Sequence, residues 1–176
     1  MGKNLIVLGI VLCVFSFSGC CLRFSDLALD TVYHVGDTFT TSGKQVKVER
    51  FQWGGGAWTD EGRARVDGRH YARGSGRDMN AGNVNLKFLF DYPISKLSLK
   101  FAEFGGNVNL RINGDHRNTS DFIDLHGSTV GGVLVDVQAV QEGGHNWYGS
   151  MTLTGTIDDV AIGGQELWLD DVCATK

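Results

Sequence analysis

Aromatic side chains stand in and beside glycine-rich turns, an arrangement that displays flat rings to a ligand from a rigid scaffold. Rings of this kind beside planar polar groups suit the faces of sugars. The candidates are Trp53, Trp58, Tyr71, Trp147 and Tyr148. In the alternative, two or three of these rings fill the hydrophobic core and contact no ligand.

A run of arginines adds a second recognition chemistry. Planar guanidinium groups bind carboxylate, sulfate or phosphate through paired hydrogen bonds. Four arginines share one parity, so a strand over 63–73 would have one cationic face. They are Arg63, Arg65, Arg69 and Arg73. The alternative is neutralisation by acids on neighbouring strands. The net charge of −4 does not point to nucleic acid as a partner.

Glu103 is the one candidate for catalysis. It shares the parity of Leu97, Leu99 and Phe101, which places it inward at a strand end. A buried carboxyl group has a raised pKa unless it finds partners. Glu103 would then serve a hydrolase or lyase with an Arg or His, or accept hydrogen bonds from the turn at 105–106. No nucleophile elbow occurs, and the five histidines lack metal spacing. The sequence therefore favours a protein that is not an enzyme.

The C-terminal region is acidic and could hold a metal. Asp170 and Asp171 lie near the end of an apolar run and could supply oxygens to a structural calcium ion. The alternative is a solvated strand end. No other cofactor is expected.

Short alternating runs fill the chain, with 25 glycines and one proline. Strands are predicted over 45–51, 83–90, 96–104 and 107–113, and near 133–137, 151–157 and 167–169. Phe51 is out of phase with Val46 and Val48, which predicts a bulge near 49–50. A tight turn is expected at 105–107 and a hairpin at Asn113-Gly114. This pattern predicts an all-β, two-sheet antiparallel sandwich that is jelly-roll-like.

The N-terminal region predicts export. Lys3 precedes an apolar run over 5–17, which is too short to span a bilayer and is typical of a signal peptide. We therefore expect a signal peptide at 1–19, an anchor and lead-in segment at 20–44, and the sandwich domain at 45–176. Ordinary cleavage after Ser18 would release a soluble protein.

The end of this region, Ser18-Gly19-Cys20, resembles the lipobox of bacterial lipoproteins. The resemblance implies that Cys20 is acylated and holds the protein in a membrane of the cell envelope. By similarity to the sorting rule of enteric bacteria, the absence of Asp at position 21 favours the outer membrane.

The domain also resembles the galactose-binding-like jelly rolls of many carbohydrate-binding modules. The resemblance is carried by Phe51, Trp58 and the strand Leu169-Asp170-Asp171-Val172, with Gln52 where that family has an acid. It implies glycan as the ligand and calcium at the C-terminal acids.

Three cysteines follow the expected signal peptide, so two thiols remain once Cys20 carries lipid. Cys21 and Cys173 could meet in a disulfide if the first and last strands are neighbours, because export permits oxidation. Otherwise they remain thiols near frayed ends.

The sequence thus indicates a non-catalytic envelope lipoprotein that binds glycan. The alternatives are a glycan-active enzyme using Glu103 and a purely architectural envelope protein.

Overall fold

The computed structural model describes residues 20–176, so the expected signal peptide and the small residues of the lipobox-like end lie outside the described part. These 157 residues contain fourteen strands, one short 3₁₀ helix and no α-helix. All their strand pairings are antiparallel. The predicted all-β antiparallel sandwich is confirmed.

The strands follow one another in chain order, with η1 (Phe122–Leu125) between β10 and β11. They are β1 (Cys20–Leu22), β2 (Val32–His34), β3 (Thr38–Thr41), β4 (Lys44–Gln52), β5 (Trp58–Thr59), β6 (Arg63–Asp67), β7 (Asp78–Gly82), β8 (Val84–Leu89), β9 (Ile94–Ile112), β10 (Asp115–Thr119), β11 (Thr129–Val130), β12 (Val133–Gln141), β13 (Trp147–Ile157) and β14 (Val160–Thr175).

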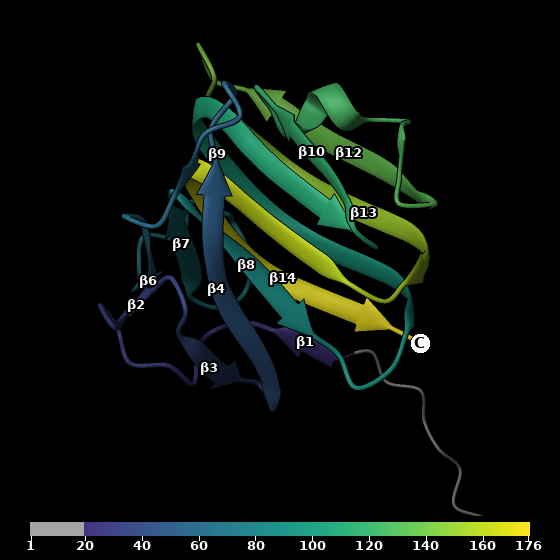
Figure 1. The fold of residues 1–176 in the computed structure, drawn as a ribbon. Helices are drawn as coiled ribbons and strands as arrows, with labels where there is room; N and C mark the ends of the chain where they lie inside the picture. The colour runs from purple at the N-terminus through teal and green to yellow at the C-terminus, as the bar shows by residue number, and fades with distance from the viewer. Residues whose placement is uncertain (1–19) are drawn as a thin grey trace, which may run out of the picture.

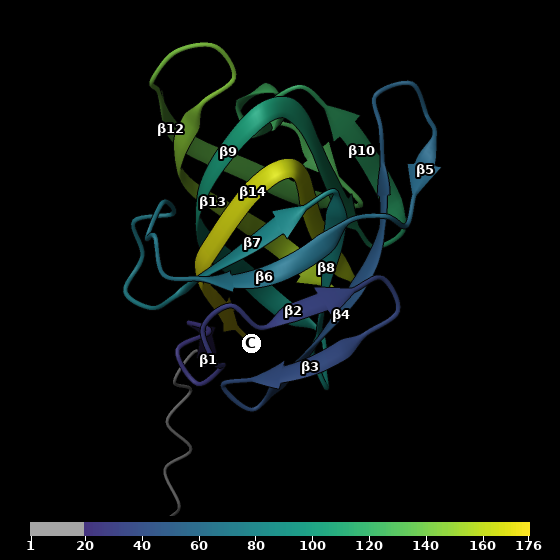
Figure 2. The same ribbon diagram turned by 90° about the vertical axis from the view of Figure 1, so that its left-hand side faces the viewer.

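Two long strands, β9 and β14, run side by side and arch over together, as Figures 1 and 2 show. The first half of β9 pairs with the second half of β14, and the second half of β9 pairs with the first half of β14. One layer adds β13, β12 and β11 on one side, and β7, β6 and β2 on the other. The other layer holds β10, β8, β4 and β3. The two layers are therefore joined by continuous, hydrogen-bonded strands.

The prediction of a tight turn at 105–107 is wrong. Gly105 and Gly106 both have positive φ, yet they lie inside the continuous strand β9. They bend one strand rather than separate two, because β14 bends beside them and pairs with β9 on both sides of the bend. The register between β14 and β9 shifts at this point, between Gly164 and Glu166. By contrast, the expected hairpin at Asn113-Gly114 joins β9 to β10, with positive φ at both residues.

The segment 20–44, expected as an anchor and lead-in, contributes three strands to the same sheets. β1 pairs with β14, β2 with β6 and β3 with β4. Leu22, Phe24 and Phe39 belong to the main core. The folded unit therefore begins at the first described residues.

Alternation of apolar residues produces the core as predicted. The inward residues of β8, both halves of β9, β12 and β13 are buried and form one cluster. They include Val84, Leu86, Phe88, Leu97, Leu99, Phe101, Val108, Leu110, Ile112, Val133, Val135, Val137, Met151, Leu153 and Ile157. The bulge predicted near 49–50 is wrong, since β4 keeps its register with β8 from Gln45 to Arg50. Phe51 is instead buried outside the main cluster, edge-on to Trp53.

Substitution of Gly163 by Ala tests the close approach of β14 and β8. A Cβ at Gly163 would lie 2.3 Å from the carbonyl oxygen of Val84 and 2.1 Å from Oδ1 of Asn85. We expect Gly163→Ala to lower the free energy of unfolding by about 1–3 kcal/mol, as overpacking does. Urea unfolding measures the loss. Gly55→Ala is the matched control, because nothing lies within 4 Å of a Cβ there; equal stability of the two variants would contradict this packing.

Candidate functional site

The structure separates the nine predicted ligand-binding side chains. Arg69, Tyr71, Arg73 and Tyr148 gather around Phe104 and Trp168 on the outside of one layer. Trp53 and Trp58 belong to the β4–β5 hairpin. Two others are apart from both groups, since Trp147 packs against the main core and Arg63 is exposed on β6. Arg65 pairs with Asp30 and with Asp67, the carboxylate that also binds Trp168 of the first group.

Trp58 stands at a groove of about 440 Å³, called here the Trp58 groove. The segment from Lys47 to Arg50 lines it, together with Val35, Gly36 and Arg111. The Trp58 residue is 44% exposed, which is unusual for so large an apolar side chain. Its ring lies 5.3 Å from the ring of His116, centroid to centroid. The hairpin thus holds a flat, accessible ring beside charged groups.

Ion pairs fix the polar side of this groove. A nitrogen of Arg111 lies 2.9 Å from Glu49 and another lies 3.1 Å from Asp159. Burial alone would lower the pKa of Arg111, but these two carboxylates raise it above its usual value. Burial, followed by the nearby charge of Arg111, lowers the pKa of His116, which is therefore neutral at neutral pH. Lys47 and Arg50 are exposed at the rim and add positive charge.

A second groove, the Tyr148 groove, lies on the outer face of β9, β12 and β13. It has a volume of about 210 Å³ and includes Arg73, Lys100, Gln138, Tyr148 and Ser150. The guanidinium of Arg73 lies 4.2 Å above the Tyr148 ring, a cation–π distance, and 2.7 Å from Glu142. Lys100 and Ser150 also line an adjoining hollow of about 330 Å³. An aromatic ring, a cation and hydroxyl groups thus share one surface.

The segment 63–73 is not one strand. β6 ends at Asp67, whose carboxylate accepts hydrogen bonds from the Arg69 N–H and from Trp168 Nε1. Burial alone would raise the pKa of Asp67, but these bonds hold it below the usual value. His70 and Arg73 then adopt positive φ in the following loop. The expected continuous cationic face is therefore wrong, since a local carboxylate turns the chain out of the strand.

Buried carboxylates also hold the rest of this loop. Asp78 accepts a hydrogen bond from the Ala72 N–H, and Asp170 accepts one from the Gly76 N–H. Burial, together with the charge of Asp170, raises the pKa of Asp78 to about 6. Burial likewise raises the pKa of Asp170. These bonds fix the loop that carries Tyr71 and Arg73 against β14.

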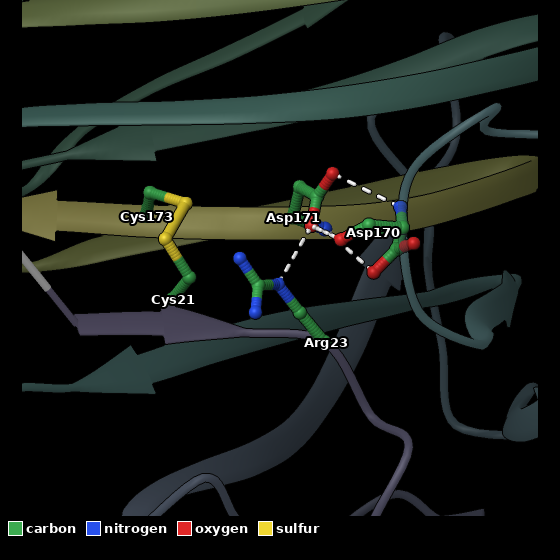
Figure 3. Close-up of a disulfide and its surroundings, with 6 residues drawn as sticks. Cys21, Arg23, Asp170, Asp171 and Cys173 are labelled. Atoms are coloured by element: carbon green, nitrogen blue, oxygen red, sulfur yellow. Dashed lines mark hydrogen bonds and ion pairs between the residues drawn. A yellow bond between two sulfur atoms is a disulfide. The ribbon is translucent and has the colours of Figure 1, made fainter.

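The two acids expected to bind calcium are engaged with donors in this structure. Asp171 accepts hydrogen bonds from the N–H and Oγ of Ser75 and from Arg23, and its own N–H donates to Asp170 (Figure 3). Across residues 20–176, no group of three or more His, Cys, Asp or Glu side chains is arranged to hold a metal ion. The N–H, hydroxyl and guanidinium donors around these acids satisfy their carboxylate oxygens.

Glu103 points inward as predicted and is 1% exposed. Its carboxyl oxygens accept the N–H of Phe122, not donors from the 105–106 bend as the alternative expected. Burial raises its pKa to about 9, assisted by the charges of Asp121 and Asp124. Glu103 is therefore protonated at neutral pH. It lines neither the Trp58 groove nor the Tyr148 groove.

A disulfide joins Cys21 to Cys173, across a sequence separation of 152. The two residues face each other in the β1–β14 pairing, and Figure 3 shows the bond between the two strands. The described N-terminal strand is thus tied to the last strand of the sheet by both hydrogen bonds and a covalent bond.

Sequence reasoning missed most of the polar residues of the grooves, which are exposed or partly exposed side chains on regular strands. They are Lys47, Glu49, Arg50 and Arg111 in the Trp58 groove, with His116 beside Trp58, and Lys100, Gln138 and Ser150 in the Tyr148 groove. The outward parity of Lys100 and Arg111 was readable from the apolar residues on either side of each. Their gathering beside Tyr148 and Trp58 depends on pairing between strands far apart in the chain.

The comparisons with known proteins give no guide to identity. No protein-family model, curated protein or solved structure matches the chain. In residues 20–176 no helix is long and apolar enough to cross a membrane.

Replacement of Glu103 by Gln tests whether the buried carboxyl group of Glu103 is protonated in the folded protein. Below about pH 4.5 the carboxyl group is protonated in both the folded and unfolded states. As the pH rises towards 9, only the unfolded state loses the proton, so stability falls by up to about 1.4 kcal/mol per pH unit and then levels off. Gln keeps the acceptor for the Phe122 N–H and cannot ionise. We expect urea unfolding to show Glu103→Gln increasingly more stable than the natural protein from pH 5 to 9. If the difference in unfolding free energy between the two proteins did not change with pH, the raised pKa of Glu103 would be contradicted.

Removal of the disulfide tests how much the covalent link between β1 and β14 stabilises the fold. A Cys21→Ala/Cys173→Ala double variant should lose about 2–5 kcal/mol of unfolding free energy, the usual cost for a bridge closing a long loop. Thermal unfolding measures the loss. The natural protein treated with reductant should approach the same value, and insensitivity to both changes would argue against the bond.

Proposed function

We propose that this protein is a lipoprotein of the cell envelope, anchored through acylated Cys20, whose sandwich domain binds glycan without turning it over. The anchor is supported by the export pattern of the sequence and its lipobox-like end. An extracytoplasmic compartment also suits the Cys21–Cys173 disulfide. The absence of Asp at position 21 favours the outer membrane.

The exposed ring of Trp58 is the observation that carries the binding proposal. Tryptophan combines a large flat apolar face with an N–H donor, and it is enriched at interfaces for this reason. Here it lies beside the Arg111–Glu49 pair, whose planar groups can exchange hydrogen bonds with sugar hydroxyls. A pyranose ring stacked on Trp58 would place its polar edge towards these groups.

Positive charge favours an anionic glycan. Lys47 and Arg50 stand at the rim of the Trp58 groove. In the Tyr148 groove, Lys100 and Arg73 flank an aromatic ring. Both grooves therefore join an aromatic face to cations, which suits sugars carrying carboxylate or sulfate groups.

The catalytic alternative is weaker on the same geometry. A general acid must reach the leaving group within hydrogen-bond distance. Glu103 is protonated at neutral pH but sealed inside the sandwich and held by the Phe122 N–H. We therefore propose a structural role for Glu103.

Substitution of Trp58 gives the direct test. Full-length protein purified in detergent is screened on an array of neutral and anionic glycans, and affinity for each bound glycan is measured. Trp58→Ala should weaken binding at least tenfold, equivalent to about 1.4 kcal/mol. Tyr92→Ala is the matched control, because Tyr92 is 46% exposed and lies outside both grooves.

Three outcomes would count against the proposal. Unchanged affinity in Trp58→Ala refutes the Trp58 groove, and a loss confined to Tyr148→Ala moves the ligand to the Tyr148 groove. Cleavage of the glycan would favour the enzyme alternative. Failure to bind any glycan would favour a purely architectural role.

A further inference from the structure

The fold leaves no free linker after the proposed anchor. The backbone of Cys20 already belongs to β1 and pairs with Ala174 of β14, followed by Cys21 with Cys173 and Leu22 with Val172. The disulfide at Cys21 locks this pairing one residue from the anchor. This inference rests on the acylation of Cys20 proposed above.

A lipid on Cys20 would therefore bring the folded body to the membrane surface. Consecutive Cα atoms are 3.8 Å apart, so Leu22 lies within about 8 Å of the acylated residue. Leu22 is fully buried in the main core. The domain cannot stand away from the bilayer on a flexible tether without breaking β1 from β14.

The surface around this point has the composition of a membrane interface. Tyr92, in the turn between β8 and β9, is 46% exposed, and the amino groups of Lys176 and Lys44 lie 4.8 and 6.0 Å from its ring centroid. Ser95 Oγ donates to the carbonyl of Thr175, which holds this turn beside the end of β14. Tyrosine and lysine are both favoured at the level of lipid headgroups.

Further cations lie on the same end. Lys96 pairs in register with Thr175, and Arg23 follows β1 with its side chain 56% exposed. Three acids offset part of this charge: Asp91 lies 2.6 Å from Lys44, Asp171 lies 3.2 Å from Arg23, and Asp26 lines a hollow with Cys21 and Arg23. Each basic residue near an anionic bilayer contributes about 1 kcal/mol of attraction.

We propose that this end of the domain, the tether face (Arg23, Tyr92, Lys96 and Lys176), docks directly on the phospholipid headgroups of the membrane that holds acylated Cys20. The opposite end then faces away from the bilayer. In both Figure 1 and Figure 2 the β4–β5 and β12–β13 hairpins stand at the top, whereas β1 and the C-terminus lie lower down. Docking would present the hairpin that carries Trp58 outward.

Quenching by labelled headgroups tests this orientation. Full-length acylated protein is reconstituted in vesicles of phosphatidylethanolamine and phosphatidylglycerol that contain a headgroup-nitroxide lipid. A bimane fluorophore is attached at Ser95→Cys, beside the tether face, or at Gly55→Cys, in the β4–β5 hairpin. We expect at least threefold stronger quenching at position 95 than at position 55. Equal quenching at the two positions overturns the docking.

Charge reversal provides a second arm. Lys96→Glu/Lys176→Glu should reduce quenching at position 95 at least twofold, whereas the matched reversal Arg63→Glu/Arg117→Glu, at exposed residues outside both grooves and the tether face, should leave it unchanged. Equal effects of the two reversals overturn the electrostatic part of the proposal. Protein that leaves the vesicles altogether overturns the anchor and the docking together. Protein that stays bound but shows no preference overturns the docking alone.

Discussion

The paired arch of β9 and β14 is the constraint on which the rest of the structure depends. Each half of one strand is hydrogen-bonded to the opposite half of the other, so both layers share a single ladder. Glycines make this arch sterically feasible: Gly105 and Gly106 supply positive φ in β9, and Gly163 lets β14 approach the backbone of β8. Because β14 also pairs with β1, β7 and β8, it positions strands of both layers directly.

The arrangement of side chains beside the Tyr148 groove depends on the same strand. Trp168 of β14 donates to Asp67 and packs against Tyr71 and Phe104, while Asp170 and Asp171 hold the loop over 68–77. This places Arg73 over Tyr148. At its C-terminal end β14 carries Cys173, the covalent partner of β1. The strand β14 thus connects the proposed anchor at one end of the domain to a candidate groove on its outer face. If the protein is held by its N-terminus, this connection fixes where the groove lies relative to the membrane.

Local patterns were sufficient for much of the fold. Period-two alternation predicts the inward faces of β8, β9 and β13, and Asn113-Gly114 predicts its hairpin, because each depends on neighbours in sequence. The bend at Gly105-Gly106 was not predictable in the same way. Two glycines permit either a turn or a bend, and only the pairing with distant β14 decides between them. Asp67 shows the same limit, since the Trp168 N–H that it accepts lies 101 residues away in the chain.

The residue types of the candidate site could be predicted from the sequence better than their arrangement in space. Aromatic and arginine side chains indicated the chemistry, but tertiary packing set the half-buried Trp147 against the core and left Trp58 exposed. The most direct test of the account is the mass of the mature protein and its N-terminal peptide, because both the proposed compartment and the proposed orientation of the domain depend on acylation of Cys20. We predict an N-terminus at Cys20 that carries two or three acyl chains, with Cys21 still bonded to Cys173. An unmodified Cys20, or cleavage at another position, would contradict the account.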